Sequence, residues 1–279
     1  MARQPSLLKP STPQTQMKIN ITPSLRSTLF VACASVAIPL QAQAQIASDN
    51  AANYGTTGNW TNSSNLGTGF GGWGITNTPG SGSAGNFIGD PSAAGITGMS
   101  ATSFGFYANP PNSGANAAAS RGFNTALLDG QTFSFQWGLN WDSDTVGSNR
   151  GFNLKSGGSE LLNINMANSS VLTIAGSPMF SNYGTQAFTL NFQQISSSSV
   201  RVYGTGRDGV EAYDNTFTGL SGRADNFAFY FNATVANVDE RQMYFNDLSI
   251  VPEPSTWILI GIGSAFLLWR IRRKDYAGS

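Results

Sequence analysis

Histidine is absent from this chain of 279 residues, and cysteine occurs once, as Cys33. The first absence excludes Ser-His-Asp and Cys-His catalytic arrangements and removes the commonest protein ligand of zinc and copper. A single cysteine provides neither an internal disulfide nor a thiolate metal site. We therefore expect no cofactor, and calcium, which prefers oxygen ligands, is the one metal left as a candidate.

Charged residues are also scarce, at 11% of the chain, and the net charge of zero hides an uneven distribution. Eight of the fifteen basic residues lie in the two end segments, so residues 46–251 hold seven basic side chains against thirteen acidic ones. Because phosphate binding needs clustered Lys and Arg, this balance argues against nucleic acid as a partner. The exported surface must consist largely of Ser, Thr, Asn and Gln, which suits an extracellular matrix.

The N-terminal segment has the pattern of a secretory leader. Two basic residues precede an apolar run, Leu29–Leu40, and a small-x-small cleavage site follows, formed by Ala42 and Ala44. We predict a signal peptide at residues 17–44, preceded by a polar extension at residues 1–16. The Sec translocon and signal peptidase are then the expected partners of this segment.

The C-terminal segment combines three features in a set order. Pro252 and Pro254 fix φ and remove two backbone donors, so this part stays extended and cannot join a helix. An uncharged apolar run, Trp257–Trp269, comes next. A basic cluster follows, which holds the C-terminal end of the apolar run in the cytoplasm. It consists of Arg270, Arg272, Arg273 and Lys274.

The apolar run predicts a transmembrane helix at residues 256–269. Thirteen uncharged residues rise about 20 Å as a helix, against the roughly 30 Å of a hydrocarbon core. Flanking residues lengthen the span, and the long basic side chains extend toward the interface. A buried core helix is the alternative, but such a helix would not be apolar all round and end in four basic residues.

These three features together resemble the PEP-CTERM sorting signal of Gram-negative bacteria. In that family an exosortase, a membrane protease, recognises the signal. The resemblance implies a recognition motif made of Val251, Pro252, Glu253, Pro254, Ser255 and Thr256. It also implies an intermediate anchored in the inner membrane, with its ectodomain in the periplasm, that later reaches the cell surface or extracellular matrix. The short tail at residues 275–279 departs slightly from the pattern.

The region between the two end segments predicts an all-β fold. Residues 45–100 are rich in Gly, Ser and Asn, which favours short strands and long turns at the start of a sandwich. Residues 101–250 contain strongly alternating segments, of which Thr132–Trp141 is the clearest. We predict an antiparallel two-sheet sandwich, a jelly roll. The segment Thr102–Ile250 also resembles the jelly-roll ectodomains often joined to this sorting tail, which are loosely similar to concanavalin A-like lectins and glucanases.

Two sets of residues are candidates for ligand binding. Trp60 and Trp73 lie in turn-rich sequence, where exposed rings would stack on sugars, although packing at the sandwich edge is the alternative. The candidate oxygen ligands for calcium are Asp142, Asp144 and Asn149. The alternative interpretation is that this segment is a solvated turn that binds no metal. A second acidic cluster consists of Asp208, Glu211 and Asp214.

Three functions follow from this pattern, in order of support. The first is an exported, non-enzymatic surface or matrix protein, with exopolysaccharide as a candidate partner. The second is a lectin-like carbohydrate-binding module. The third is a glycosidase or polysaccharide lyase, which would need two facing carboxylates. The Glu-x-Asp-x-x-Glu strand of a jelly-roll glucanase does not occur in the sequence.

Overall fold

A computed structural model describes residues 45–109, 114–139, 148–167, 171–181, 186–206, 209–233 and 242–252. These residues all belong to the larger of two units, which covers Gln43–Ser279. Several predictions lie outside the described residues: the polar extension and signal peptide, residues 253–256 of the sorting motif, the transmembrane helix with its basic cluster, the pair Asp142 and Asp144, and Asp208. Among the helices that the structure does describe, none is long and apolar enough to cross a membrane.

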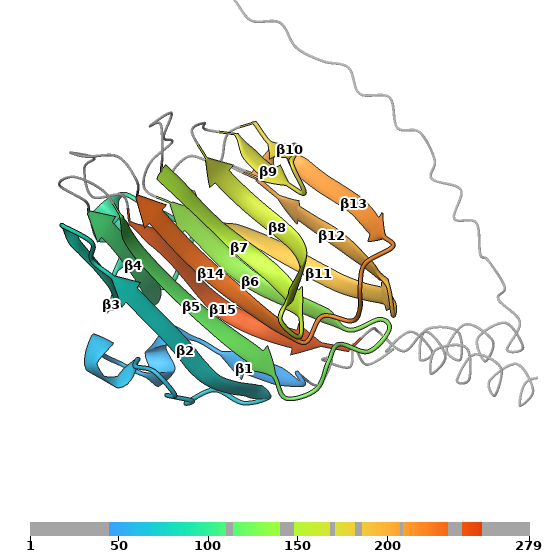
Figure 1. Ribbon diagram of the computed structural model, residues 1–279, viewed down its shortest axis with the longest axis horizontal. Coiled ribbons are helices and arrows are strands. Elements are labelled where there is room, and N and C mark those ends of the chain that lie inside the picture. The colour runs from blue at the N-terminus through green and yellow to red at the C-terminus, as the bar shows by residue number, and fades with distance from the viewer. Residues whose placement is uncertain are drawn as a thin grey trace, which may run out of the picture. The chain divides into compact units, whose positions relative to one another are not determined.

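The described chain forms two antiparallel sheets packed face to face (Figure 1). The first, the eight-stranded sheet, has the order β13 (Ala212–Thr218), β12 (Ser199–Thr205), β11 (Phe188–Ser196), β6 (Thr132–Leu139), β15 (Met243–Val251), β4 (Ser103–Asn109) and β3 (Ser83–Gly89), with β1 (Ala47–Asp49) paired to β15. The second, the seven-stranded sheet, has the order β10 (Ser177–Phe180), β9 (Leu172–Ile174), β8 (Ser159–Ala167), β7 (Ser148–Ser156), β14 (Asn226–Ala233), β5 (Ala115–Phe123) and β2 (Phe70–Thr78).

The strand order confirms the predicted all-β sandwich. Neighbouring strands are often distant in sequence, because the chain repeatedly crosses from one sheet to the other, as β6 and β15 show. Helical structure among the described residues is limited to the short 3-10 turns η1 (Ala51–Asn53), η2 (Thr57–Asn59) and η3 (Pro91–Ala94). These turns lie on loops and leave both sheets intact.

Aromatic side chains fill the space between the sheets, as the alternating sequence pattern predicts. On β6, Phe133 and Phe135 are fully buried, and on β14 the same is true of Phe229. The rings of Phe135 and Phe229, from opposite sheets, lie 4.9 Å apart edge to face, and Phe229 stacks on Phe245 at 3.9 Å. Such pairs contribute beyond their buried area, so they define how the sheets face each other.

A buried ion pair joins the N-terminal strand to the opposite sheet. Asp49 on β1 and Arg121 on β5 form a salt bridge in which both side chains are inaccessible to solvent. The hydroxyl of Tyr54 donates to Asp49 at 2.9 Å. The Arg121 guanidinium also lies 4.9 Å from the ring centres of Phe70 and Trp73. The short strand β1 is therefore anchored by charge and by its pairing with β15.

Candidate functional site

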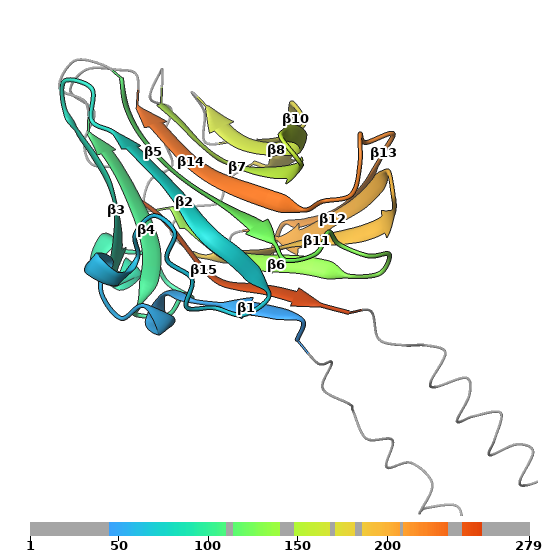
Figure 2. The same cartoon turned by 60° about the horizontal axis from the view of Figure 1, so that its bottom comes forward.

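The outer face of the seven-stranded sheet is the candidate functional surface. Its strands bend so that this face is concave (Figure 2). Since alternate side chains point to opposite sides of a sheet, burial of one set in the core leaves the other set outside. That outer set is mainly amides and hydroxyls, namely Thr76, Asn116, Ser120, Asn149, Asn153, Asn163, Asn165, Asn226, Tyr230 and Asn232.

This face carries almost no charge. Of the described strand residues that point outward from the sheet, Lys155 and Glu160 are the ionised ones, and they lie opposite each other on β7 and β8. Paired opposite charges on neighbouring strands offset each other. The face is therefore suited to an uncharged polar ligand.

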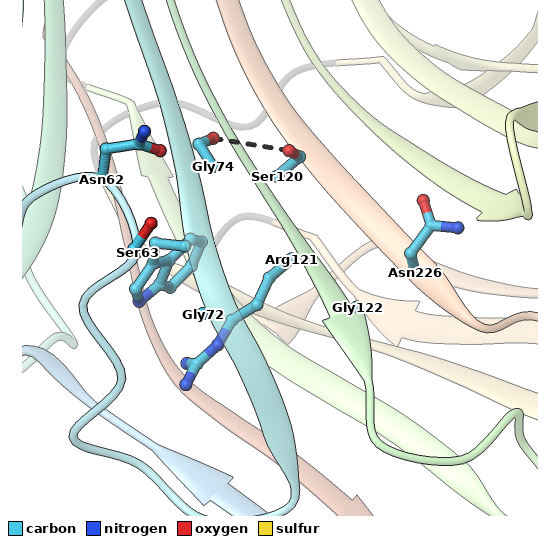
Figure 3. A pocket seen from close by; sticks show the side chains of 9 residues that line it. Asn62, Ser63, Gly72, Gly74, Ser120, Arg121, Gly122 and Asn226 are labelled. Carbon is cyan, nitrogen blue, oxygen red and sulfur yellow. Dashed lines mark hydrogen bonds between the residues drawn. The ribbon is translucent and has the colours of Figure 1, made fainter.

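A groove of about 670 Å³ on this face extends from residues 62–63 over β2 and β5 to Asn226 on β14. Its floor is backbone, because Gly72 and Gly74 on β2 and Gly122 on β5 have no side chains to fill it. Figure 3 shows Asn62 and Asn226 on opposite sides of the groove, with Gly74 and Ser120 between them. Glycines on two adjacent strands thus open a polar depression at the sheet edge.

Hydrogen bonds fix the two asparagine side chains at the sides of the groove and leave one polar atom of each for a ligand. The Ile75 amide donates to Asn62 Oδ1 at 3.1 Å, and Asn226 Nδ2 donates to the Gly157 carbonyl at 2.8 Å. The other atom of each amide, Asn62 Nδ2 and Asn226 Oδ1, has no hydrogen-bond partner in the described part of the chain. The groove therefore presents one donor and one acceptor across its width.

Tyr230 provides an aromatic surface further along the same face. It lies opposite Gly151 on β7, where any Cβ atom would collide with the phenol ring and its oxygen. The Tyr230 hydroxyl reaches past β7 and accepts a hydrogen bond from Asn163 Nδ2 on β8 at 2.8 Å. A side chain that extends from β14 to β8 must lie along the sheet, so one ring face is turned outward.

The environment of Tyr230 keeps the phenol neutral and leaves its hydrogen available. Burial raises the pKa of Tyr230 above its usual value, against the smaller opposing effect of the Asn163 hydrogen bond. Within the described residues nothing accepts the Tyr230 hydroxyl hydrogen. Two buried amide oxygens on the flanking strand positions, Asn149 Oδ1 and Asn165 Oδ1, likewise have no partner there. Because these two oxygens are enclosed, the hydroxyl hydrogen of Tyr230 is the hydrogen-bonding group that this part of the face leaves for a ligand.

The structure corrects the prediction that Trp60 and Trp73 stack on sugars. Their exposed fractions are 0% and 1%, so neither ring can meet a ligand. Trp60 packs against Trp73 at 5.7 Å and against Phe104 at 4.7 Å, and the Trp73 indole donates to Tyr54 at 3.1 Å. The turn-rich sequence around them folds over the sandwich and buries both rings, which is the alternative stated above.

The candidate calcium ligands are not brought together among the described residues. Asn149 lies on the outer face, but its predicted partners Asp142 and Asp144 are outside the described residues. In the second cluster, Glu211 accepts from the Ser181 amide at 2.9 Å, whereas Asp214 pairs with Arg201. Asp208 is not described. In the part of the chain that the structure covers, no three acidic, Cys or His side chains form a metal cluster.

Comparison with known proteins identifies the C-terminal segment. The family model of the PEP-CTERM protein-sorting motif matches residues 251–274. The chain carries this sorting motif. The sequence-based prediction at these positions is confirmed, and the motif implies export, association with the membrane and processing by an exosortase. No curated protein is similar enough in sequence to match the chain.

Several solved structures match part of the chain at low similarity. The binding domain of botulinum neurotoxin serotype C1 is 12% identical, with a TM-score of 0.41, over 69% of this chain and 47% of that one. The binding domain of botulinum neurotoxin DC, in complex with rat synaptotagmin II, is 13% identical, with a TM-score of 0.40, over 65% and 44%. The chain thus spans less than half the length of these proteins, and values this low do not transfer a function.

Proposed function

We propose that this chain is an exported, non-enzymatic protein of the cell surface or extracellular matrix, sorted and processed by an exosortase through residues 251–274. The observation that carries this proposal is the sorting motif itself. The predicted signal peptide, which ends at Ala44, supports it from the other end of the chain. The same two signals support an inner-membrane intermediate with a periplasmic ectodomain.

The fold supports processing close to the membrane. Val251, the first residue of the motif, is also the last residue of β15 and pairs with Thr132 on β6. Five residues separate it from Trp257, the first residue of the apolar run. Even fully extended, these residues and their ends cover only about 20 Å. The sandwich would therefore lie near the membrane surface until the protease releases it.

Fractionation and mass spectrometry test the sorting proposal. The double variant Pro252→Ala and Pro254→Ala should remain full-length in the membrane fraction, whereas the wild-type protein should lose its C-terminal segment. A matched control is Pro178→Ala on the exposed start of β10, which should be processed normally. An intact C-terminal segment in every mature form of the wild-type protein would contradict the proposal.

A second candidate function is carbohydrate binding by the outer face of the seven-stranded sheet. The observation in its favour is an aromatic ring, Tyr230, laid along the sheet among uncharged amides. Aromatic faces bind the apolar faces of sugar rings, and amides pair with their hydroxyls. This surface replaces Trp60 and Trp73 as the proposed sugar-binding site, and exopolysaccharide in the matrix is the natural ligand to test.

The same surface supports binding over hydrolysis. A glycosidase needs two carboxylates within about 5 to 9.5 Å of each other. Glu160 is the carboxylate on the described part of the outer face, and it lies opposite Lys155 rather than another acid. Asp225, just before β14, is occupied with the Gly157 amide at 2.8 Å. On this described surface Glu160 faces a lysine and Asp225 is held by a backbone amide, an arrangement that favours binding over bond cleavage.

Affinity electrophoresis tests the carbohydrate proposal. Neutral probes such as arabinoxylan, galactomannan and mixed-linkage glucan, cast in a native gel, should retard the protein, whereas acidic alginate should not. Incubation with the retained probe should release no new sugar ends. Migration unchanged by every neutral polysaccharide would refute the binding function, and release of sugar ends would reassign the protein as a hydrolase or lyase.

A further inference from the structure

The two binding elements of the outer face lie on one strand. Asn226, in the groove, and Tyr230, the aromatic surface, are both on β14 and lie four positions apart. An even separation places both side chains on the same side of the sheet. At about 3.3 Å per residue, their Cα atoms are roughly 13 Å apart. A single small sugar cannot contact both, but an extended chain can.

Small residues predominate among the described neighbours of the path between these elements. Ala228 is the one outward-facing residue of β14 between them, and its cross-strand neighbours are Ser120 on β5 and Asn153 on β7. On β5, Ala118 lies opposite Tyr230. Small side chains thus line the track on the β5 side, and the amide of Asn153 borders it on the other.

Hydrogen-bonding groups are available at both ends of this track. At the groove end, Asn226 Oδ1 lies on the track and Asn62 Nδ2 faces it from across the groove, and the other end presents the hydroxyl hydrogen of Tyr230. Each group is held by a second hydrogen bond, so little conformational freedom is lost when a ligand binds. Fixed polar groups that converge on one track favour a ligand with hydroxyls at regular intervals.

We infer that one uncharged polysaccharide chain lies lengthwise along β14 and contacts the groove and Tyr230 at the same time. This inference rests on the carbohydrate-binding function proposed above and adds the ligand class and its direction. The groove lies on the surface of the sheet, so the inferred binding needs no chain terminus. The acidic balance of residues 46–251, thirteen acidic against seven basic side chains, disfavours an acidic polysaccharide.

Titration calorimetry with oligosaccharides of increasing length tests this inference on the full mature protein. The oligosaccharides are cut from whichever neutral polysaccharide retards the protein in the gel. Affinity should rise by about tenfold or more once the chain is long enough to reach from Asn226 to Tyr230. Added salt should leave it unchanged, since neither partner contributes a charge.

Three variants separate the two contacts. Tyr230→Ala and Asn226→Ala should each remove the rise in affinity with oligosaccharide length while leaving weak binding of short oligosaccharides. Ala228→Leu, which places a branched side chain midway on the track, should do the same without removing either contact. Tyr107→Ala is the matched control, because Tyr107 also lies over a glycine, Gly85, but on the eight-stranded sheet. It should bind like the wild type.

The outcomes distinguish failure of the lengthwise arrangement from failure of the proposed carbohydrate binding. Binding that is strong for a disaccharide and does not rise with length, or that Ala228→Leu leaves intact, overturns the lengthwise arrangement but keeps a carbohydrate-binding protein. Equal loss in the Tyr107→Ala variant overturns the assignment to this face. Absence of binding to every neutral polysaccharide overturns both proposals.

Discussion

Removal of the Asp49 carboxylate should strongly destabilise the sandwich. Both side chains of the Asp49–Arg121 pair are inaccessible to solvent, so Asp49→Ala leaves a guanidinium without its countercharge in the core. Breaking a buried pair in this way costs about 3–5 kcal/mol. The Tyr54 hydroxyl also loses its acceptor, which adds about 1 kcal/mol. Against a typical total stability of 5–15 kcal/mol, this loss is severe.

Urea denaturation followed by tryptophan fluorescence measures this effect, since the buried Trp73 lies beside the pair. Asp214→Ala, which breaks the exposed pair with Arg201, is the control and should change the midpoint little. Replacing both members, as Asp49→Leu with Arg121→Met, should recover much of the loss because no uncompensated charge remains. The reasoning fails if Asp49→Ala is no more harmful than Asp214→Ala.

Three further outcomes are expected. Trp60→Ala should destabilise the fold by about 3–5 kcal/mol in thermal denaturation, since it empties a buried site; full stability with reduced sugar binding would restore the original ligand role of this ring. Burial raises the pKa of Tyr244 to about 12, above the pKa near 10 of a tyrosine in the unfolded chain. The stabilisation from the buried neutral phenol is therefore complete below pH 10 and is lost as the pH rises toward 12. Tyr244→Phe should flatten that part of the curve of melting temperature against pH, and an unchanged curve argues against this assignment. Gly151→Ala should displace the Tyr230 ring and weaken polysaccharide retardation in the native gel; wild-type retardation would show that the ring position is unimportant.

Much of the architecture follows from the order of residues alone. The alternation of apolar and polar residues in Thr132–Leu139 and Asn226–Ala233 specifies which side chains face the core, because a strand has a period of two. The all-β prediction, the buried aromatic face and the confirmed sorting motif all come from such local patterns. They need no knowledge of which strands are neighbours.

The binding surface could not be predicted in the same way. Tyr230 is recognisable as an outward-facing residue of its strand, but its position over Gly151 depends on the register between β14 and β7. The groove likewise requires glycines from β2 and β5, which are about 50 residues apart in the chain. Register between distant strands is decided by packing across the whole sandwich.

What the sequence by itself determined is therefore local: the strand pattern, the scarcity of charge and the sorting motif at residues 251–274. The tertiary structure decided which aromatic rings are available to a ligand. It buried Trp60 and Trp73 under turn-rich segments and turned Tyr230 outward. The physical reason is that solvent exposure depends on what lies above a residue, and those covering segments come from elsewhere in the chain.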